Sequence, residues 1–343
     1  MPPSSSQLHS GATCNRPNQL SVGVSVVIPV FNSAVILPKL VARLGEVLEA
    51  TEEPYELILV NDSSPCHCWE IIKEIVSQHP WVRGICMMRN YGQHNALLCG
   101  IRTAIYDKLL TMDDDLQHRP EQIPVLLATL KDGNDVVYGI PENEENGLFR
   151  VIANRITKLA LCSVIGIKIA KDVSAFRALR TQLRDAFVEY QTPFVSIDGL
   201  LAWATTRFAS RVVSFDKRHA GVSNYTFRKL VRHAFDMMTG FSTFPLQVAS
   251  VMGFVLAIFG VGVLFYILGR YFLSGSSIPG FPFLASIIAL FSGTQLFALG
   301  VIGEYLVRIH FRSMKQPAYV IREMIHQPPD SKDRISSMPD YSE

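Results

Sequence analysis

Short apolar runs rich in β-branched residues alternate with longer mixed segments between residues 24 and 138. Apolar runs of four to eight residues between turn signals indicate buried strands, and longer mixed segments indicate helices. We predict strands at 24–30, 57–60, 82–88, 108–112 and 135–138, and helices at 36–50, 69–77, 90–106 and 124–130. Strands that alternate with helices form parallel βαβ units with right-handed crossovers. The pattern therefore predicts an α/β fold with a mostly parallel sheet.

Two long uncharged stretches lie nearer the C-terminus. Residues 237–269 and 271–303 contain no Asp, Glu, Lys or Arg, and Arg270 alone separates them. A helix needs roughly 20 apolar residues to cross a bilayer core, and both stretches contain such a run without a polar face. We predict two transmembrane helices, at about 246–270 and 281–306. The alternative is a pair of buried helices in a soluble core.

Positive charges flank the two predicted spans, whereas the loop between them has only Arg270. The flanking basic residues are Arg228, Lys229, Arg232, Arg308, Arg312 and Lys315. Because positive residues stay on the cytoplasmic side, we expect a multi-pass protein of the inner (cytoplasmic) membrane with its α/β domain and both termini in the cytoplasm. Residues 226–243 mix apolar and basic side chains, which favours an interfacial amphipathic helix over an ordinary surface helix.

The remaining composition adds few special features. Residues 1–21 are polar and lack an apolar core, so we expect a disordered tail, and we assign residues 311–343 to a cytoplasmic C-terminal tail. The net charge of +2 without a concentrated basic face argues against a nucleic-acid partner. The six cysteines lack disulfide-like spacing, so we expect free thiols in a cytoplasmic domain. Cys66 and Cys68 lack the second cysteine pair of a structural zinc site.

Three consecutive acids, Asp113, Asp114 and Asp115, follow the predicted strand at 108–112. The carboxyl ends of strands are where ligands bind in open α/β sheets. Like charges this close repel each other, and a hard divalent cation with oxygen ligands would neutralise them. The alternative is a solvated acidic turn. Asp62 follows another strand, and neither a G-x-G-x-x-G fingerprint nor a P-loop is present.

Four ordered motifs, at residues 25–32, 60–64, 89–94 and 113–121, resemble glycosyltransferase family 2. The resemblance is strongest to the polyprenyl-phosphate glycosyltransferases, a group that includes dolichyl-phosphate mannose synthase and bacterial enzymes that load glucose or aminoarabinose onto undecaprenyl phosphate. It covers about residues 22–325. It implies a GT-A catalytic domain over residues 22–225, a nucleotide-sugar donor with uridine as the expected base, and a Mg²⁺ or Mn²⁺ cofactor.

The resemblance also implies roles for individual residues. The expected catalytic residues are Asp115, Asp113 and Arg218, and the expected nucleotide-binding residues are Pro29, Phe31, Asp62, Asp113 and Asp114. Asp115 and Gln117 match the positions nearest the metal. The acceptor side is expected to hold Ser174, Arg177, Asp198 and Ser223. Asp198 is either a proton acceptor or the N-cap of a helix, and the N-cap is favoured.

The chain departs from the family pattern at several positions. Ser33 and Ala34 follow Asn32, where members often carry two acids, and Asp114 stands where many members have alanine. Pro141 and Asn224 replace residues that are usually basic. These replacements imply altered contacts to the diphosphate and the acceptor phosphate, or a different sugar.

The implied reaction is transfer of the sugar, with inversion, to a polyprenyl phosphate at the cytoplasmic membrane face. A phosphomonoester has a second pKa of about 6, so this acceptor is ionised at neutral pH and needs no essential base. Two alternatives are transfer to a non-lipid or growing polysaccharide acceptor, and an inactive membrane-anchored subunit that binds sugar nucleotides. Small residues in the predicted spans make a homo-oligomer plausible.

Overall fold

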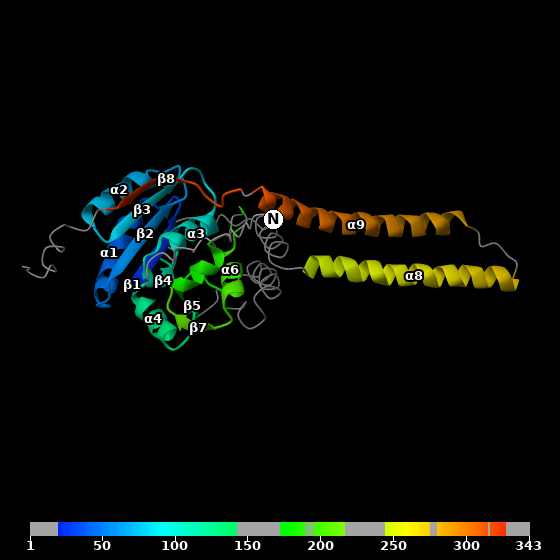
Figure 1. Ribbon diagram of the computed structural model, residues 1–343, viewed down its shortest axis with the longest axis horizontal. Coiled ribbons are helices and arrows are strands. Elements are labelled where there is room, and N and C mark those ends of the chain that lie inside the picture. The colour runs from blue at the N-terminus through cyan, green and yellow to red at the C-terminus, as the bar shows by residue number, and fades with distance from the viewer. Residues whose placement is uncertain are drawn as a thin grey trace, which may run out of the picture.

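The computed structural model describes residues 20–142, 172–188, 190, 192, 195–216, 244–274, 280–314 and 316–326. These residues form an α/β unit and two long helices (Figure 1). Within this part of the chain, the α/β unit contains an eight-stranded sheet in the order β7-β5-β6-β4-β1-β2-β3-β8. The strands are β1 (Ser21–Val30), β2 (Tyr55–Asn61), β3 (Val82–Met87), β4 (Tyr106–Thr111), β5 (Val136–Pro141), β6 (Arg177–Arg180), β7 (Phe208–Val213) and β8 (Ile321–His326).

The predicted fold class is confirmed, because the centre of the sheet is parallel. Strand β1 pairs in parallel with β2 and β4, and β2 pairs in parallel with β3. Strand β6 lies antiparallel between β4 and β5, while β7 runs parallel to β5. This is a GT-A-like α/β arrangement, and it brings the loops after β1, β2 and β4 to one edge of the sheet.

Helices cover both faces of the sheet. Apolar residues of β1 alternate between the faces: Val26 and Ile28 pack with one core cluster, and Val27 packs with the other. Helices α1 (Leu37–Glu49), α2 (Cys68–Gln78) and α4 (Ile123–Lys131) contribute to the first cluster. Helices α3 (Gln93–Thr103) and α6 (Ile197–Ala204), with the 3₁₀ helix η2 (Thr181–Phe187), contribute to the second, and a short 3₁₀ turn η1 (Pro120–Gln122) precedes α4.

The close packing of α3 on the sheet depends on a small residue. A Cβ atom added at Gly100 would lie 2.3 Å from Cγ1 of Val27 on β1. Real side chains do not approach this closely, so the helix could not keep its place with a larger residue there. Because α3 begins beside the loops at the carboxyl edge, this contact helps to fix the geometry of that edge.

Strand β8 corrects the assignment of residues 311–343 to a tail. It pairs antiparallel with β3, with Gly84 opposite Ile325 and Cys86 opposite Glu323. The Glu323 carboxylate accepts a hydrogen bond from the indole of Trp69 on α2 at 2.9 Å. The sheet therefore extends beyond the predicted 22–225 domain and includes a strand that follows both long helices.

The two long helices are α8 (Phe244–Ser274) and α9 (Phe281–Ser313), which extend side by side away from the α/β unit (Figure 1). Segments Pro245–Ile267 and Leu290–Phe311 are long and apolar enough to cross a membrane. A Cβ at Gly260 of α8 would meet the Phe291 ring of α9 at 2.8 Å, so the helices touch there.

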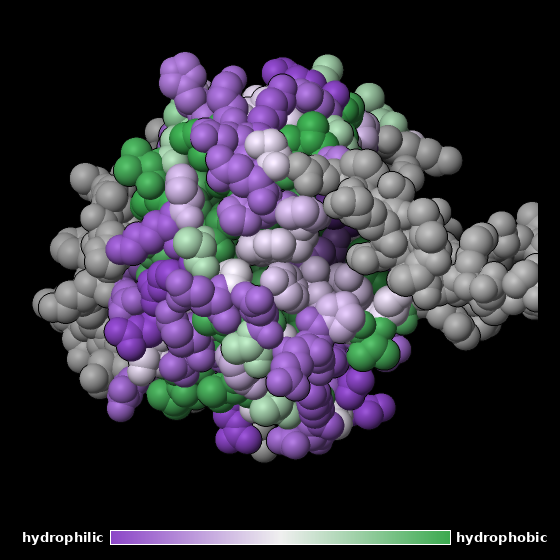
Figure 2. All heavy atoms as spheres, turned by 90° about the vertical axis from the view of Figure 1, so that its left-hand side faces the viewer, coloured by the Kyte–Doolittle hydropathy of each residue, from purple (hydrophilic) through white to green (hydrophobic). Residues whose placement is uncertain are grey.

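Large apolar side chains cover the outside of this helix pair, including Phe254, Phe265 and Leu299, each more than 60% exposed. The face of the α/β unit that points away from the helices is different, because hydrophilic residues dominate it and hydrophobic ones are scattered (Figure 2). An exposed apolar surface on this scale marks contact with a membrane or another protein. The predicted interfacial helix at 226–243 lies outside the described residues, as do residues 1–19 of the predicted tail at 1–21, whose last residue, Ser21, begins β1.

Candidate active site

Three loops meet at the carboxyl edge of the sheet, one after each of β1, β2 and β4. Each contains a non-glycine residue with positive φ: Asn32 at 59°, Ser63 at 51° and Leu116 at 59°. Such conformations are uncommon outside glycine and persist where the surroundings over-determine them. A fourth such residue among the described ones, Glu52, lies elsewhere, so three of the four fall in the loops that carry the predicted nucleotide and metal residues.

The Asp114 side chain connects two of these loops: the loop after β4, which carries Asp113 to Asp115 and which we call the acid loop, and the loop after β1. Its Oδ2 accepts hydrogen bonds from the backbone N–H of Phe31 at 3.0 Å and the hydroxyl of Ser33 at 2.5 Å. Burial, with the neighbouring Asp113 and Asp115 charges, raises the pKa of Asp114 to about 6 despite these two donors. This contact accounts for one departure from the family pattern. An acid at position 33 would repel Asp114, whereas a serine hydroxyl can donate to it.

The carboxylates of Asp113 and Asp115 are half-buried beside this contact. Asp113 Oδ1 accepts from the amide of Gln93 at 2.6 Å, and Asp115 Oδ1 accepts from the backbone N–H of Gln117 at 3.1 Å. The backbone N–H of Asp113 donates to Nδ1 of His118 at 3.1 Å, which closes the turn. The acids therefore lie on a short, internally bonded loop at the sheet edge.

The donor set of this loop fits a hard divalent cation. Within the described ranges, no group of three or more His, Cys, Asp or Glu side chains forms a ready-made metal cage. Mg²⁺ is usually held by one or two carboxylates together with substrate phosphates rather than by an all-protein cage. Asp113, Asp115 and the Gln117 amide can supply such a partial set of oxygen ligands, which a diphosphate would complete.

Asp62 links the loop after β2 to the start of α3. Its two carboxylate oxygens accept the backbone N–H groups of Tyr91 at 2.7 Å and Gly92 at 2.8 Å. Burial raises the pKa of Asp62, and these two hydrogen bonds partly offset that effect. The Arg89 guanidinium lies over the Tyr91 ring, 4.6 Å from its centroid. The predicted nucleoside contact of Asp62 stays a prediction, and the structure adds that this carboxylate orders the segment before α3.

A buried polar network occupies the predicted acceptor side. Arg177 forms an ion pair with Asp198, and its Nε donates to the Thr111 hydroxyl at 3.1 Å. The Tyr138 hydroxyl donates to Asp198 at 3.0 Å. Burial, together with the Asp198 carboxylate, raises the pKa of Tyr138 well above its ordinary value, so it stays protonated as a donor. Ser174 lies nearby in sequence and accepts the backbone N–H of Phe176 at 3.2 Å.

The N-cap assignment of Asp198 is wrong. Ser196 caps helix α6, because its hydroxyl oxygen accepts the backbone N–H of Gly199 at 3.3 Å. Asp198 lies in the first turn with its side chain directed to Arg177 instead. Serine and aspartate are both favoured N-cap residues, so the sequence alone does not decide between Ser196 and Asp198. The ion pair with Arg177 decides it, because it holds the Asp198 side chain away from the helix end.

Sequence reasoning missed a contact that fastens residues 215–216 to the acid loop. Phe215 pairs with His118 in an isolated antiparallel bridge, and the backbone N–H of Asp216 donates to the carbonyl of Gln117 at 2.9 Å. Arg119 forms an ion pair with Asp216 at 2.5 Å. We call this set of contacts the 118–216 clasp. The signal in the sequence was the basic Arg119, four residues after the last of the three acids, but its partner is 97 residues away.

The buried ring of His118 holds the centre of the clasp. It stacks on Phe176 with the ring centroids 5.2 Å apart and meets Phe215 edge-on at 5.0 Å. Burial lowers the pKa of His118 to about 4, so the ring is neutral and its Nδ1 can accept the Asp113 hydrogen bond. The predicted residues Arg218 and Ser223 lie outside the described part of the chain.

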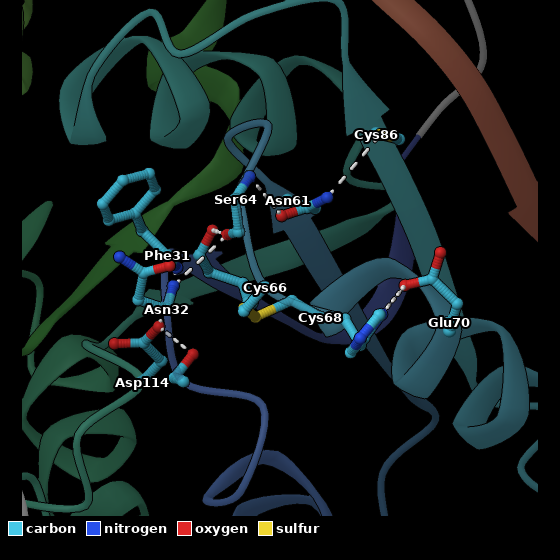
Figure 3. Close-up of a disulfide and its surroundings, with 12 residues drawn as sticks. Phe31, Asn32, Asn61, Ser64, Cys66, Cys68, Glu70, Cys86 and Asp114 are labelled. Atoms are coloured by element: carbon cyan, nitrogen blue, oxygen red, sulfur yellow. Dashed lines mark hydrogen bonds and ion pairs between the residues drawn. A yellow bond between two sulfur atoms is a disulfide. The ribbon is translucent and has the colours of Figure 1, made fainter.

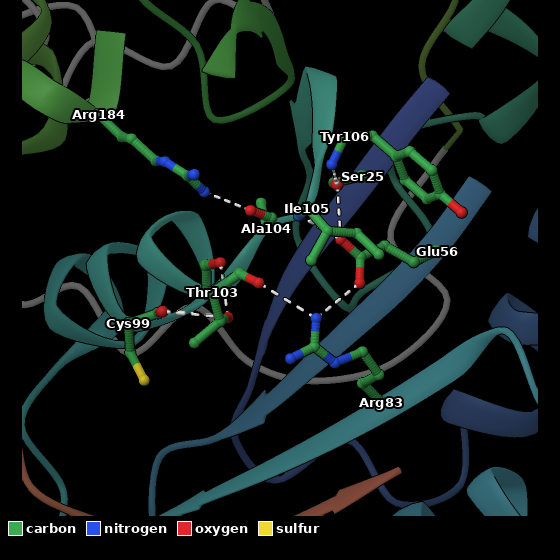
Figure 4. A network of polar contacts seen from close by, with 10 residues as sticks. Ser25, Glu56, Arg83, Cys99, Thr103, Ala104, Ile105, Tyr106 and Arg184 are labelled. Atoms are coloured by element: carbon green, nitrogen blue, oxygen red, sulfur yellow. Dashed lines mark hydrogen bonds and ion pairs between the residues drawn. The ribbon is translucent and has the colours of Figure 1, made fainter. Parts of the chain in front are cut away.

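The expectation of free thiols is wrong for two of the cysteines. Cys66 and Cys68 form a disulfide in the loop between β2 and α2, and their Cα atoms are 5.4 Å apart (Figure 3). This separation falls within the usual range for disulfides, which a one-residue spacer can reach when the chain turns. Cys86 and Cys99 are free thiols, as expected, and both are buried; Cys99 lies on α3 near its C-terminal end (Figure 4).

Comparisons with known proteins identify the family of this chain. The model of the family "Glycosyl transferase family 2" matches residues 25–190. The undecaprenyl-phosphate 4-deoxy-4-formamido-L-arabinose transferase of Proteus mirabilis is 34% identical over 88% of this chain and 94% of its own length. The enzyme of the same name from Photorhabdus laumondii is 33% identical over 88% and 94%.

Among solved structures, glucosyl-3-phosphoglycerate synthase from Mycobacterium tuberculosis in complex with phosphoglyceric acid is similar, with 15% identity and a TM-score of 0.47. That likeness covers 64% of this chain and 79% of the solved one. The relatives match at above 30% identity over nearly their whole length, and the family model falls on the strands and loops that form the acid edge. The chain belongs to glycosyl transferase family 2.

Proposed function

We propose that this glycosyltransferase moves a sugar from a uridine-diphosphate donor to undecaprenyl phosphate, with inversion at the anomeric carbon. One observation carries the proposal: the same chain has an acid loop whose carboxylates can hold a metal-bound diphosphate and two apolar helices long enough to cross a membrane. The names of the relatives, which state the same acceptor, support it. They also make a 4-deoxy-4-formamido-L-arabinose donor the first candidate sugar.

Asp113, Asp115 and Gln117 would hold Mg²⁺ or Mn²⁺ at the edge of the sheet. When bound, such a cation supplies Lewis-acid stabilisation of the charge on the leaving diphosphate. Pro29, Phe31 and Asp62 would form the nucleoside pocket, with Asp114 holding Phe31 in place.

Arg218 would add a fixed positive charge near the diphosphate. Its predicted position is supported by the 118–216 clasp, because Asp216 is hydrogen-bonded to the acid loop and Arg218 follows two residues later. A positive charge there would stabilise the negative charge that develops on the leaving diphosphate.

The acceptor phosphate acts as its own nucleophile in this proposal. It is ionised at neutral pH and needs no proton removed before it attacks. The engagement of Asp198 by Arg177 and Tyr138 supports a site without a dedicated base. A sugar-hydroxyl acceptor would instead require a carboxylate poised to take a proton.

The proposed location is the cytoplasmic face of the inner membrane, with α8 and α9 as the two spans. The excess of basic residues on the outer flanks of the spans supports this orientation, with the α/β unit and both termini in the cytoplasm. Large apolar side chains of α8 and α9 remain exposed beside their contact at Gly260, which leaves room for lipid or a second copy of the chain.

Transfer of radiolabelled sugar from UDP-sugars to undecaprenyl phosphate tests the function directly. The purified full-length protein in undecaprenyl-phosphate-containing vesicles should convert the label to an organic-extractable product in the presence of Mg²⁺ or Mn²⁺. The Asp115→Ala variant serves as the matched control and should give only background. Label that enters only water-soluble products would reject the lipid acceptor.

A further inference from the structure

The loop between β2 and α2 contains a disulfide that the proposed reaction does not use. Cys66 and Cys68 are joined across one residue, His67. The loop lies beside the predicted nucleoside pocket, in which Phe31 forms a wall. Figure 3 shows Cys66 between Cys68 on one side and Asn32 and Ser64 on the other, with Asp114 close to Asn32. A covalent bond that can be made and broken is thus located next to the residues expected to hold the donor.

This disulfide is poorly suited to hold the fold together. In the chain-entropy account, the stabilisation by a disulfide grows with the length of the loop it closes, and here the loop has a single intervening residue. Cys68 is the first residue of α2 and fully buried, so the apolar core already fixes that end. Loss of the bond would therefore change the local path of the loop far more than the global stability.

Hydrogen bonds of Ser64 connect this loop to the segment that carries Phe31. The backbone N–H of Ser64 donates to the Asn61 side chain at 3.2 Å, and its hydroxyl donates to the carbonyl of Val30 at 3.3 Å. The same hydroxyl oxygen accepts the backbone N–H of Asn32 at 3.3 Å. Asn32 directly follows Phe31, so a shift of Ser64 alters the wall of the pocket.

The pair is also accessible to an external reductant. The His67 side chain between the two cysteines is 94% exposed, and Cys66 is only half-buried. Exposed disulfides are the labile and regulatory ones, and those in cytoplasmic proteins are usually transient. The predicted cytoplasmic location of the α/β unit would place this bond in a reducing environment.

We propose that Cys66 and Cys68 form a redox modification site that controls donor-nucleotide binding. A cellular dithiol reduces the bond: its thiolate attacks one sulfur and releases the other as a thiolate, and its second thiol then resolves the mixed disulfide. The protein gains two electrons and two protons, and the reductant leaves as a disulfide. The reduced loop loses the constraint at residues 66–68, Ser64 shifts, and nucleotide binding weakens. This inference rests on the proposed use of a nucleotide donor.

Calorimetry of UDP binding to the full-length protein in both redox states tests the proposal. One sample is oxidised with diamide and the other is reduced with dithiothreitol, and mass mapping of alkylated peptides confirms the state of Cys66 and Cys68. We expect the reduced protein to bind UDP about five-fold more weakly, the size of effect expected for one lost hydrogen bond. Reoxidation should restore the affinity.

Variants separate this pair from the other thiols. Cys66→Ser/Cys68→Ser should bind UDP as weakly as the reduced protein in both states, whereas Cys99→Ala, a change at a buried free cysteine on α3 outside the Ser64 contacts, should keep the full redox response. Equal affinity of the oxidised and reduced wild-type protein would overturn the redox site and leave the transfer reaction standing. Absence of UDP binding in both states would reject the uridine donor and this inference together, and lipid transfer from another nucleotide sugar would show which part of the function survives.

Discussion

Replacement of Asp198 by alanine separates a structural role of this carboxylate from a catalytic one. The side chain is buried and forms an ion pair with Arg177, a residue only 2% exposed. Tyr138 donates a second hydrogen bond to the same oxygen at 3.0 Å. Asp198→Ala would leave the Arg177 cation buried without a countercharge and the Tyr138 hydroxyl without its acceptor.

The expected cost of this substitution is large. Removal of one partner from a buried ion pair typically costs about 3–5 kcal/mol, because the remaining charge stays desolvated. For a domain of this size, a loss of about 3 kcal/mol lowers the melting temperature by roughly 6–12 °C. Asp198→Asn should cost less, since the amide oxygen can still accept from Tyr138 or Arg177. The double replacement Arg177→Met/Asp198→Leu removes both charges and should recover most of the lost stability.

Thermal unfolding followed by circular dichroism, together with sugar transfer at a temperature where each variant is folded, measures both effects. At such a temperature we expect both Asp198→Asn and Asp198→Ala to keep substantial transfer activity, and Asp198→Ala to lose it only as the protein unfolds on heating. The reasoning would be refuted if Asp198→Ala melted within about 1 °C of the wild type, well below the shift expected for a broken buried pair. If that stable variant were also inactive, Asp198 would be acting as the base.

Three further predictions concern the edge of the sheet. Asp115→Ala should abolish transfer without lowering the melting temperature. Chelation of metal from the wild-type protein should cause the same loss of transfer until Mg²⁺ or Mn²⁺ is added back. Near-normal turnover in either experiment would contradict the metal site. Deletion of residues 321–343 should expose the unpaired edge of β3 and cause aggregation in size-exclusion chromatography, whereas a chain that ends at His326 should stay monodisperse. Arg119→Ala should lower kcat, and Asp216→Ala should lower it at least as far, because Asp216 also pairs with Arg43 at 3.6 Å; the double variant should match Asp216→Ala, and multiplicative losses would show that the Arg119–Asp216 ion pair is not the unit that acts.

The sequence predicted the strands that carry their own signal. Strands β1 to β5 are apolar runs, and the structure finds them near their predicted positions. Strand β6 begins and ends with arginine, and Arg177 can be buried there only because Asp198 and Thr111 neutralise and bond it. Strand β8 does alternate between half-buried and exposed residues, but its period-two pattern follows a membrane-like helix and was assigned to a tail. Both strands depend on partners that no local pattern reveals.

For the candidate site, the sequence predicted where the acids lie but not which residues bond to them. Asp62 and the acids after β4 gather at one edge because the carboxyl ends of adjacent parallel strands meet there. Their hydrogen-bond partners come from distant segments: Ser33 lies 81 residues from Asp114, and Asp216 lies 97 residues from Arg119. Residue type and strand order fix where the acids lie, while tertiary packing decides which of their oxygens remain available to a ligand.

Strand β8 gives the helix pair a second role in the proposed function. Helix α9 ends at Ser313, and the chain is already anchored again at Ala318, which is 3% exposed. The backbone carbonyl of Val320 then accepts from Met88 at 2.9 Å, just before the β3–β8 ladder begins. The five residue steps between Ser313 and Ala318 span at most about 18 Å. In the proposed topology, this short link holds the carboxyl edge of β3, and with it the segment that Asp62 orders, close to the lipid headgroups. An acceptor phosphate fixed to the bilayer by its isoprenoid chain can therefore meet the donor without leaving the interface, which a catalytic domain on a long flexible linker would not ensure.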